Sequence, residues 1–259
     1  MSDFGELSKP EEQILPSSSE LSLSHEQMDK MSSDLVTLSK LRSCAHENGY
    51  TFALTGGYAV DAIDGGKISR FHADMDGVFF VPPTVPYETV TKALGEQLLV
   101  EETPWELVKD EEGSLEYREA DERKEWEMRR RLELDIFEPS LNTKTMTKTL
   151  VDLEGKSQDF DVLSVEDLLA AKVLSMVRLA DMTQEEREAA GLRDMKVSDK
   201  ADFHRLLKSP EFNEQATIGS LAGAIRYISE DQISPEEAGN EALSQWQKAM
   251  SIINSEEYV

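Results

Sequence analysis

The chain has 259 residues, and its 52 acidic against 27 basic side chains give a formal net charge of −25 at pH 7. Such a surface repels phosphate backbones, which argues against a general DNA- or RNA-coating role and favours cationic ligands or carboxylate-bound divalent metals. The single cysteine, Cys44, excludes an internal disulfide and a cysteine-based zinc site. With no run of 18 apolar residues and no secretory signal, we expect no membrane partner and a cytoplasmic location.

The first part of the chain alternates between helical and extended patterns. Residues 1–23 are rich in Ser, Glu and Pro, and we expect a disordered tail there. Ser24 opens a capping-box pattern, and apolar positions then recur at helical spacing until Asn48-Gly49, which predicts a helix. The later patterns predict short strands over 50–54 and 74–81, a short helix over 58–63 and a longer one over 87–98.

The middle of the chain has the period of two that is typical of strands. Such patterns appear over 105–108, 115–117, 132–137 and 147–153. After Ser164, which precedes an acidic first turn, the apolar spacing changes to that of helices and stays so to the C-terminus. We therefore predict an α+β fold, a mixed sheet with helices followed by a helical C-terminal domain, with a tail over 1–23, a core over 24–160 and the helical domain over 161–259.

The stretch from Leu54 to Phe80 holds the residues suited to chemistry. At Gly56-Gly57 the missing Cβ atoms let the backbone approach a phosphate, and the following helix points its positive N-terminus at the same place. Asp74 and Asp76, two apart on a strand, project from one face, as shared Mg²⁺ ligands require. A third carboxylate on a neighbouring strand would complete the site. Asp135 is the candidate, and Glu133, on the same face, is the alternative.

This pattern resembles the nucleotidyltransferases of the polymerase-β superfamily, most of all the branch of aminoglycoside and lincosamide nucleotidyltransferases and related toxins. The resemblance spans about residues 50–207, and one departure is Gly77, where the family places an aliphatic residue. The positions that carry it are Gly56, Gly57, Ala59, Gly66, Arg70, His72, Asp74, Asp76, the run 164–169, Lys172 and the segment 200–202.

The resemblance implies a role for each matched residue. Asp74 and Asp76 would hold Mg²⁺, and Asp135 would bind a second metal and act as base. The residues implied to bind the nucleotide are Gly56, Gly57, Arg70, His72 and Lys172. Several local alternatives stay open: Arg70 can pair with an acid, His72 can pack in a loop, Lys172 can extend to solvent, and Lys200 can pair with Asp202.

The expected reaction is Mg²⁺-dependent transfer of a nucleoside monophosphate from a nucleoside triphosphate such as ATP to an acceptor hydroxyl. The acidic composition favours a small cationic acceptor such as an aminoglycoside, which would make the chain an antibiotic-resistance enzyme. A toxin-type enzyme that acts on tRNA is the first alternative, because Arg129-Arg130-Arg131 forms a basic cluster. The second is a catalytically silent binding protein, for which Gly77 is the hint.

Overall fold

The computed structural model describes residues 23–98, 105–111, 113–121, 124, 128–137, 144–189 and 197–255. The expected disordered tail therefore lies outside the described residues, except for Leu23. The described parts contain these elements: α1 (His25–Glu47), β1 (Thr51–Leu54), α2 (Gly56–Ile63), β2 (Met75–Phe80), α3 (Tyr87–Leu98), β3 (Trp105–Glu111), β4 (Ser114–Glu119), β5 (Arg131–Phe137), β6 (Thr145–Val151), β7 (Ser157–Leu163), α4 (Val165–Asp181), α5 (Gln184–Ala189), α6 (Val197–Leu207), α7 (Glu214–Ile228) and α8 (Pro235–Asn254).

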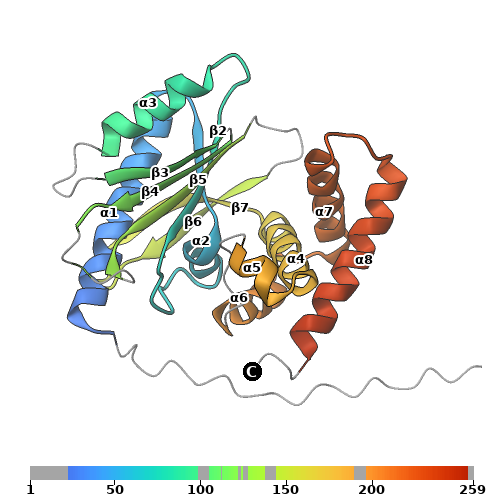
Figure 1. Cartoon of the computed structure of the whole chain (residues 1–259). Helices are drawn as coiled ribbons and strands as arrows, with labels where there is room; N and C mark the ends of the chain where they lie inside the picture. The colour runs from blue at the N-terminus through green and yellow to red at the C-terminus, as the bar shows by residue number, and fades with distance from the viewer. Residues whose placement is uncertain are drawn as a thin grey trace, which may run out of the picture.

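The described strands form one mixed sheet in the order β3-β4-β5-β2-β1-β7-β6. The β2–β5 and β1–β7 pairs are parallel, and the other neighbouring pairs are antiparallel. Helices α1 and α3 pack against each other beside this sheet (Figure 1). Helices α4, α7 and α8, which follow the last strand in the chain, pack against one another. The predicted α+β class, a mixed sheet followed by C-terminal helices, is confirmed.

The two faces of the sheet differ in character. Met75 and Phe79 of β2, with Leu132 and Leu134 of β5, face the main apolar core. This core continues without a break into α4, α7 and α8, so the predicted division at residue 160 stays a prediction. The opposite face carries the intervening residues of the same strands and only a small apolar cluster of Ala53, Val78 and Phe80. The polar candidates of β2 and β5 lie on this second face.

Local capping signals place the helix ends where the sequence predicts them. The Ser24 side chain accepts a hydrogen bond from the Gln27 backbone N–H, and the Gln27 side chain accepts one from the Ser24 N–H, as in a capping box. Asn48 ends α1, followed by Gly49 at φ +74°. Ser164 caps α4 by accepting from the Asp167 N–H. Among the described helices, none is long and apolar enough to cross a membrane.

Gly77 lies in a regular stretch of strand. It pairs with Leu54 of β1 and Leu134 of β5, and it faces the main core. A Cβ built on Gly77 would lie 2.4 Å from a ring carbon of Phe52, whose ring centroid is 5.1 Å from that of Phe79. The missing side chain thus makes room for Phe52, and Asp76 keeps its place in the ladder.

We expect Gly77→Ala to lower the free energy of unfolding by about 1–3 kcal/mol, because the new methyl group must displace a buried aromatic ring. Gly95→Ala in α3 is the matched control, since nothing lies within 4 Å of its added Cβ. There, alanine should raise stability by about 0.5–1 kcal/mol through helix propensity. Urea denaturation of both variants measures the difference. Equal effects of the two substitutions would contradict the packing argument.

Candidate active site

The candidate carboxylates come together on the second face of the sheet. In the parallel β2–β5 pair, Asp76 lies opposite Glu133, and Val78 lies opposite Asp135. Residues paired in this way project from the same face, and Asp74 precedes β2 with the same parity. Glu133 is therefore the neighbour of Asp76, while Asp135 lies one residue pair further along the face, opposite Ser114 of β4.

Burial and neighbouring negative charges both disfavour the ionised form of the Asp76 carboxyl. Its removal from water, followed by the negative charges of Asp74 and Glu133, raises the pKa of Asp76 well above its usual range, although Lys172 and Arg131 oppose the shift. Desolvation also raises the pKa of Glu133, with Asp74 and Glu116 adding to the rise. The positive charge of the protein itself thus compensates these carboxylates only in part, which favours binding of an added cation.

Arg131 is the cation that contacts this cluster directly. Its Nη2 atom lies 2.5 Å from Asp74 Oδ2, and its Nε atom lies 3.1 Å from Glu133 Oε1. Residues 131 and 133 share a face because they are two apart on β5. One guanidinium therefore joins the carboxylate before β2 to the carboxylate on β5.

The two glycines at the start of α2 allow the backbone to approach Asp76, His72 and Arg70 closely. Gly56 has φ +58°, in the left-handed region, and a Cβ on it would lie 1.8 Å from Asp76 Oδ2. A Cβ on Gly57 would lie 2.3 Å from His72 Nδ1 and 2.8 Å from Arg70 Nη2. Any larger residue would fill this space, so the first turn of α2 depends on glycine at both positions.

Arg70 and Lys172 share one acidic partner, Asp202 of α6. Arg70 Nη2 lies 2.8 Å from Asp202 Oδ2, and Lys172 Nζ lies 3.4 Å from the same oxygen. Arg205 Nη1 lies 3.7 Å from the other Asp202 oxygen. Asp202 thus contacts positive side chains from three separate segments. Lys200, the partner considered from the sequence, donates a hydrogen bond to the Ser255 carbonyl.

His72 is buried beside Asp61 and Tyr58. Its Nε2 atom lies 2.7 Å from Asp61 Oδ2, and its ring centroid lies 4.2 Å from that of Tyr58. Asp61 also accepts hydrogen bonds from the Ser69 backbone N–H and hydroxyl, and its other carboxylate contact is Arg205 at 2.7 Å. These contacts fix the loop between α2 and Asp74, so the geometry gives His72 a positioning role. Its role in nucleotide binding stays a prediction.

Three members of this arrangement were not predicted as site residues: Arg131, Asp61 and Asp202. Strand parity offered a signal for Arg131, because it precedes Glu133 by two residues. No local signal marks Asp61, whose partners Ser69 and His72 lie 8 and 11 residues away in sequence. Asp202 lies in the segment 200–202 that carries the resemblance, but its partners Lys172 and Arg70 lie 30 and 132 residues away.

The donor chemistry of the cluster fits a divalent cation. Asp74, Asp76 and Glu133 supply carboxylate oxygens from one face, which is the ligand type that Mg²⁺ prefers. Among the described residues, no three acidic, histidine or cysteine side chains form a ready-made metal cage. Two of the three carboxylates bind Arg131 instead.

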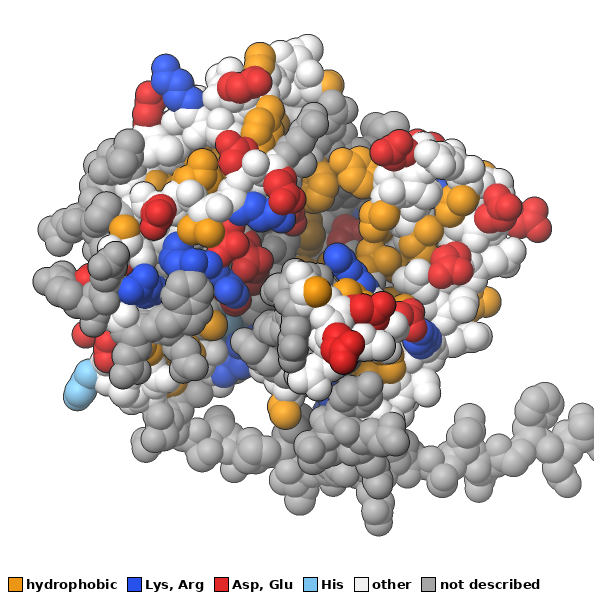
Figure 2. All heavy atoms as spheres, in the orientation of Figure 1, with side chains coloured by type: hydrophobic (Ala, Val, Ile, Leu, Met, Phe, Trp, Pro, Cys, Tyr) orange, Lys and Arg blue, Asp and Glu red, His pale blue; other side chains and the backbone are white. Residues whose placement is uncertain are grey.

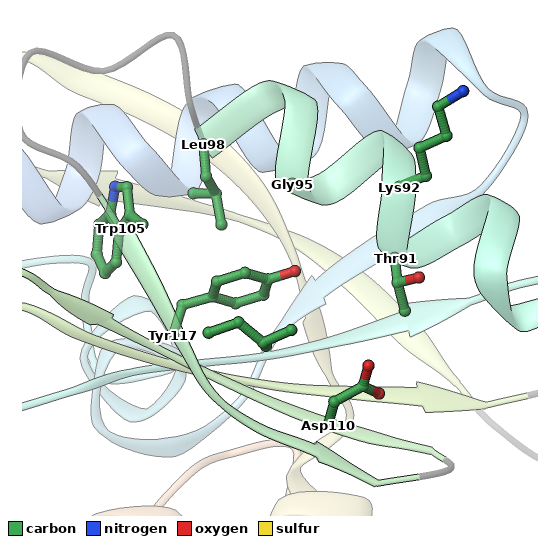
Figure 3. A pocket seen from close by; sticks show the side chains of 8 residues that line it. Thr91, Lys92, Gly95, Leu98, Trp105, Asp110 and Tyr117 are labelled. Carbon is green, nitrogen blue, oxygen red and sulfur yellow. The ribbon is translucent and has the colours of Figure 1, made fainter.

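A hollow elsewhere on the molecule lies between α3 and the β3–β4 hairpin (Figure 3). Trp105 and Tyr117 line it, and Tyr117 pairs with Leu132, which places it on the face of the main core. The hollow is therefore on the opposite face of the sheet from Asp76 and Glu133, and it contains no predicted site residue.

Comparisons with solved structures return nucleotidyltransferases. A crystal structure of ANT(2'')-Ia in complex with adenylyl-2''-tobramycin matches 75% of this chain and 99% of its own, at 15% identity and a TM-score of 0.49. An antigenic nucleotidyltransferase-like protein from Paracoccidioides brasiliensis matches 84% and 94%, at 18% identity and 0.40. JHP933 from Helicobacter pylori matches 90% and 95%, at 14% identity and 0.42. No family model and no curated protein matches the sequence.

Proposed function

We propose that this protein is a Mg²⁺-dependent nucleotidyltransferase that moves a nucleoside monophosphate from a nucleoside triphosphate to a hydroxyl of a small cationic acceptor. The observation that carries the proposal is the close approach of the Gly56 backbone to the Asp76 carboxylate, beside Glu133 on the next strand. A glycine turn at a helix N-terminus suits phosphates, and clustered carboxylates suit the metal that accompanies them.

Each side chain then has a role that follows from its position. Asp74 and Asp76 hold the metal, which supplies charge stabilisation for the triphosphate when bound. Polymerase-β-like nucleotidyltransferases generally use divalent metals. Lys172 and Arg70, which Asp202 holds together, balance the phosphate charge. A carboxylate of β5 accepts the proton of the acceptor hydroxyl, and the register favours Glu133 for this role over Asp135.

The distribution of charge supports a cationic acceptor rather than RNA. Glu116, Glu133 and Asp135 share the site face with Asp76 of β2 and with Asp74, which precedes that strand. The cluster Arg129-Arg130-Arg131 is not a continuous basic patch. Arg130 is buried against Glu119 and lies over the Trp105 ring, whereas Arg131 binds the carboxylates. Acidic and basic side chains are also interspersed on the face drawn in Figure 2. With a net charge of −25 and a site face rich in carboxylates, the protein attracts cations better than it attracts a phosphate backbone.

The structure also weakens the sequence hint for a catalytically silent protein. Gly77 takes part in regular pairing on both sides, so it does not displace Asp76 from its place opposite Glu133.

The experiment that tests the proposal is a transfer assay. The full chain is incubated with Mg²⁺ and each of four α-labelled nucleoside triphosphates, together with aminoglycosides, lincosamides or total tRNA. We expect label on a cationic small molecule and none on RNA. Label on tRNA alone would overturn the acceptor class. No label on any acceptor, combined with no nucleotide binding by calorimetry, would overturn the enzyme function.

A further inference from the structure

We propose that Arg131 serves as a counter-cation of the metal site. Its guanidinium pairs with the carboxylates of the site until a bound nucleoside triphosphate replaces them as its partner. The inference rests on the proposed function and adds a regulation of the same site. Metal alone would then bind weakly, because it must displace an arginine, whereas the triphosphate would bind with the help of that arginine.

The contacts of Arg131 carry the first step of the argument. Its guanidinium reaches Asp74 at 2.5 Å and Glu133 at 3.1 Å, the two carboxylates that flank Asp76. The side chains of Arg131 and Asp74 are 30% and 26% exposed, so this pair is partly withdrawn from water, and its attraction is stronger than that of a surface pair. The Glu133 side chain is 49% exposed, so its attraction to Arg131 is weaker. A divalent ion that uses either carboxylate therefore competes with a cation that belongs to the chain.

The second step concerns where the guanidinium goes. Arg131 shares the face that carries Asp76, whose carboxylate touches the Gly56 turn. A triphosphate at that turn would come close to Arg131, and a guanidinium matches phosphate oxygens with two parallel hydrogen bonds. Transfer of Arg131 from carboxylate to phosphate releases Asp74 and Glu133 for the metal. The same residue thus opposes metal binding and assists triphosphate binding.

Asp202 has the corresponding role for the cations of the site. It neutralises Arg70 and Lys172, the cations assigned to phosphates, as Arg131 neutralises the carboxylates assigned to the metal. Asp74, Glu133, Arg70 and Lys172 are therefore already paired within the chain. A separate metal ion or a separate anion meets a satisfied partner, whereas the two together replace both sets of pairs.

The test uses two probes with the full chain: Mn²⁺ alone, and ATP at a fixed high concentration of Mg²⁺, each by titration calorimetry. Arg131→Gln keeps hydrogen-bond donors but loses the charge. We expect it to bind Mn²⁺ at least about tenfold more tightly than the wild type, and to bind ATP at least about tenfold more weakly. Arg118→Gln is the matched control, because Arg118 lies opposite Arg131 on β4 and pairs with Glu116. It should change both affinities by less than about threefold.

The opposite signs separate this proposal from a structural role, since a distorted site would weaken both ligands. Weaker or unchanged Mn²⁺ binding in a folded Arg131→Gln protein would overturn it, as would unchanged ATP binding. Arg131→Lys provides a second variant in case the glutamine protein does not fold. It keeps the charge, so its Mn²⁺ affinity should stay within about threefold of wild type, and a gain like that expected of glutamine would overturn the proposal. The transfer assay is not part of this test, so absence of an acceptor would contradict the proposed function without touching the role of Arg131.

Discussion

Asp76→Asn is expected to lower nucleotide transfer by about a thousandfold or more, roughly 4 kcal/mol of barrier, and to raise the stability of the ligand-free protein. The loss follows because Asp76 lies between the Gly56 turn and Glu133, where a metal would need its charge. The gain follows because the wild-type carboxylate is desolvated and repelled by Asp74 and Glu133.

The pH dependence has a definite sign. Because the pKa of Asp76 is higher in the folded protein than in the unfolded chain, the folded state holds its proton to a higher pH. Stability from this residue is therefore greatest near and below the usual pKa of 3.8 and is lost as pH rises through the raised pKa. Asp76→Asn removes this loss, so its advantage over wild type should grow from pH 4 to neutral pH, at about 1.4 kcal/mol per pKa unit.

Thermal unfolding at several pH values, with and without Mg²⁺ and ATP, measures both effects. Wild type should gain melting temperature from Mg²⁺ and ATP together, and Asp76→Asn should not. Asp159→Asn provides the control, since Asp159 is an exposed aspartate of β7 that accepts from Thr149. If Asp76→Asn is less stable than wild type at neutral pH, the positive charges near Asp76 stabilise its carboxylate more than desolvation and the neighbouring acids destabilise it.

The second large effect is expected at the third carboxylate. Glu133→Gln should lower transfer by about a hundredfold or more, whereas Asp135→Asn should lower it by less than about tenfold, because Glu133 is the residue paired with Asp76. The sequence prediction was the reverse, with Asp135 as the candidate third carboxylate and Glu133 as the alternative. That assignment stays a prediction, and the strand register favours Glu133.

Single-turnover rates of the two variants with a saturating triphosphate decide between these assignments. Both side chains lie on one face of β5, and both have a raised pKa through desolvation, so the substitutions are well matched. A larger loss for Asp135→Asn would mean that the reacting groups lie one residue pair further along β5 than the position of Asp76 indicates.

Local sequence signals determined most of the individual elements. The serine caps at Ser24 and Ser164 fix helix starts through hydrogen bonds to residues three positions away, so they can be predicted from a short window. The alternation over 132–137 likewise separates the core face of β5 from its polar face. Two elements were missed. Strand β7 carries acidic and polar residues on its exposed side. Helix α5 is short and consists mostly of polar and charged residues. Neither segment therefore shows a strong apolar period.

Only the tertiary structure decided the register between β2 and β5 and the ion-pair partners of the charged side chains. The sequence placed Asp76 and the β5 carboxylates on strands, but a parallel pair has no connecting turn to fix which residues lie opposite each other. The pairing of Arg131 with Asp74, and of Asp202 with Arg70, joins residues 57 and 132 positions apart. Charges attract whichever opposite charge the fold brings near, and that depends on long-range packing of the whole sheet and its helices. Composition and local period therefore indicate which residues can do the chemistry, while the fold decides which of them meet.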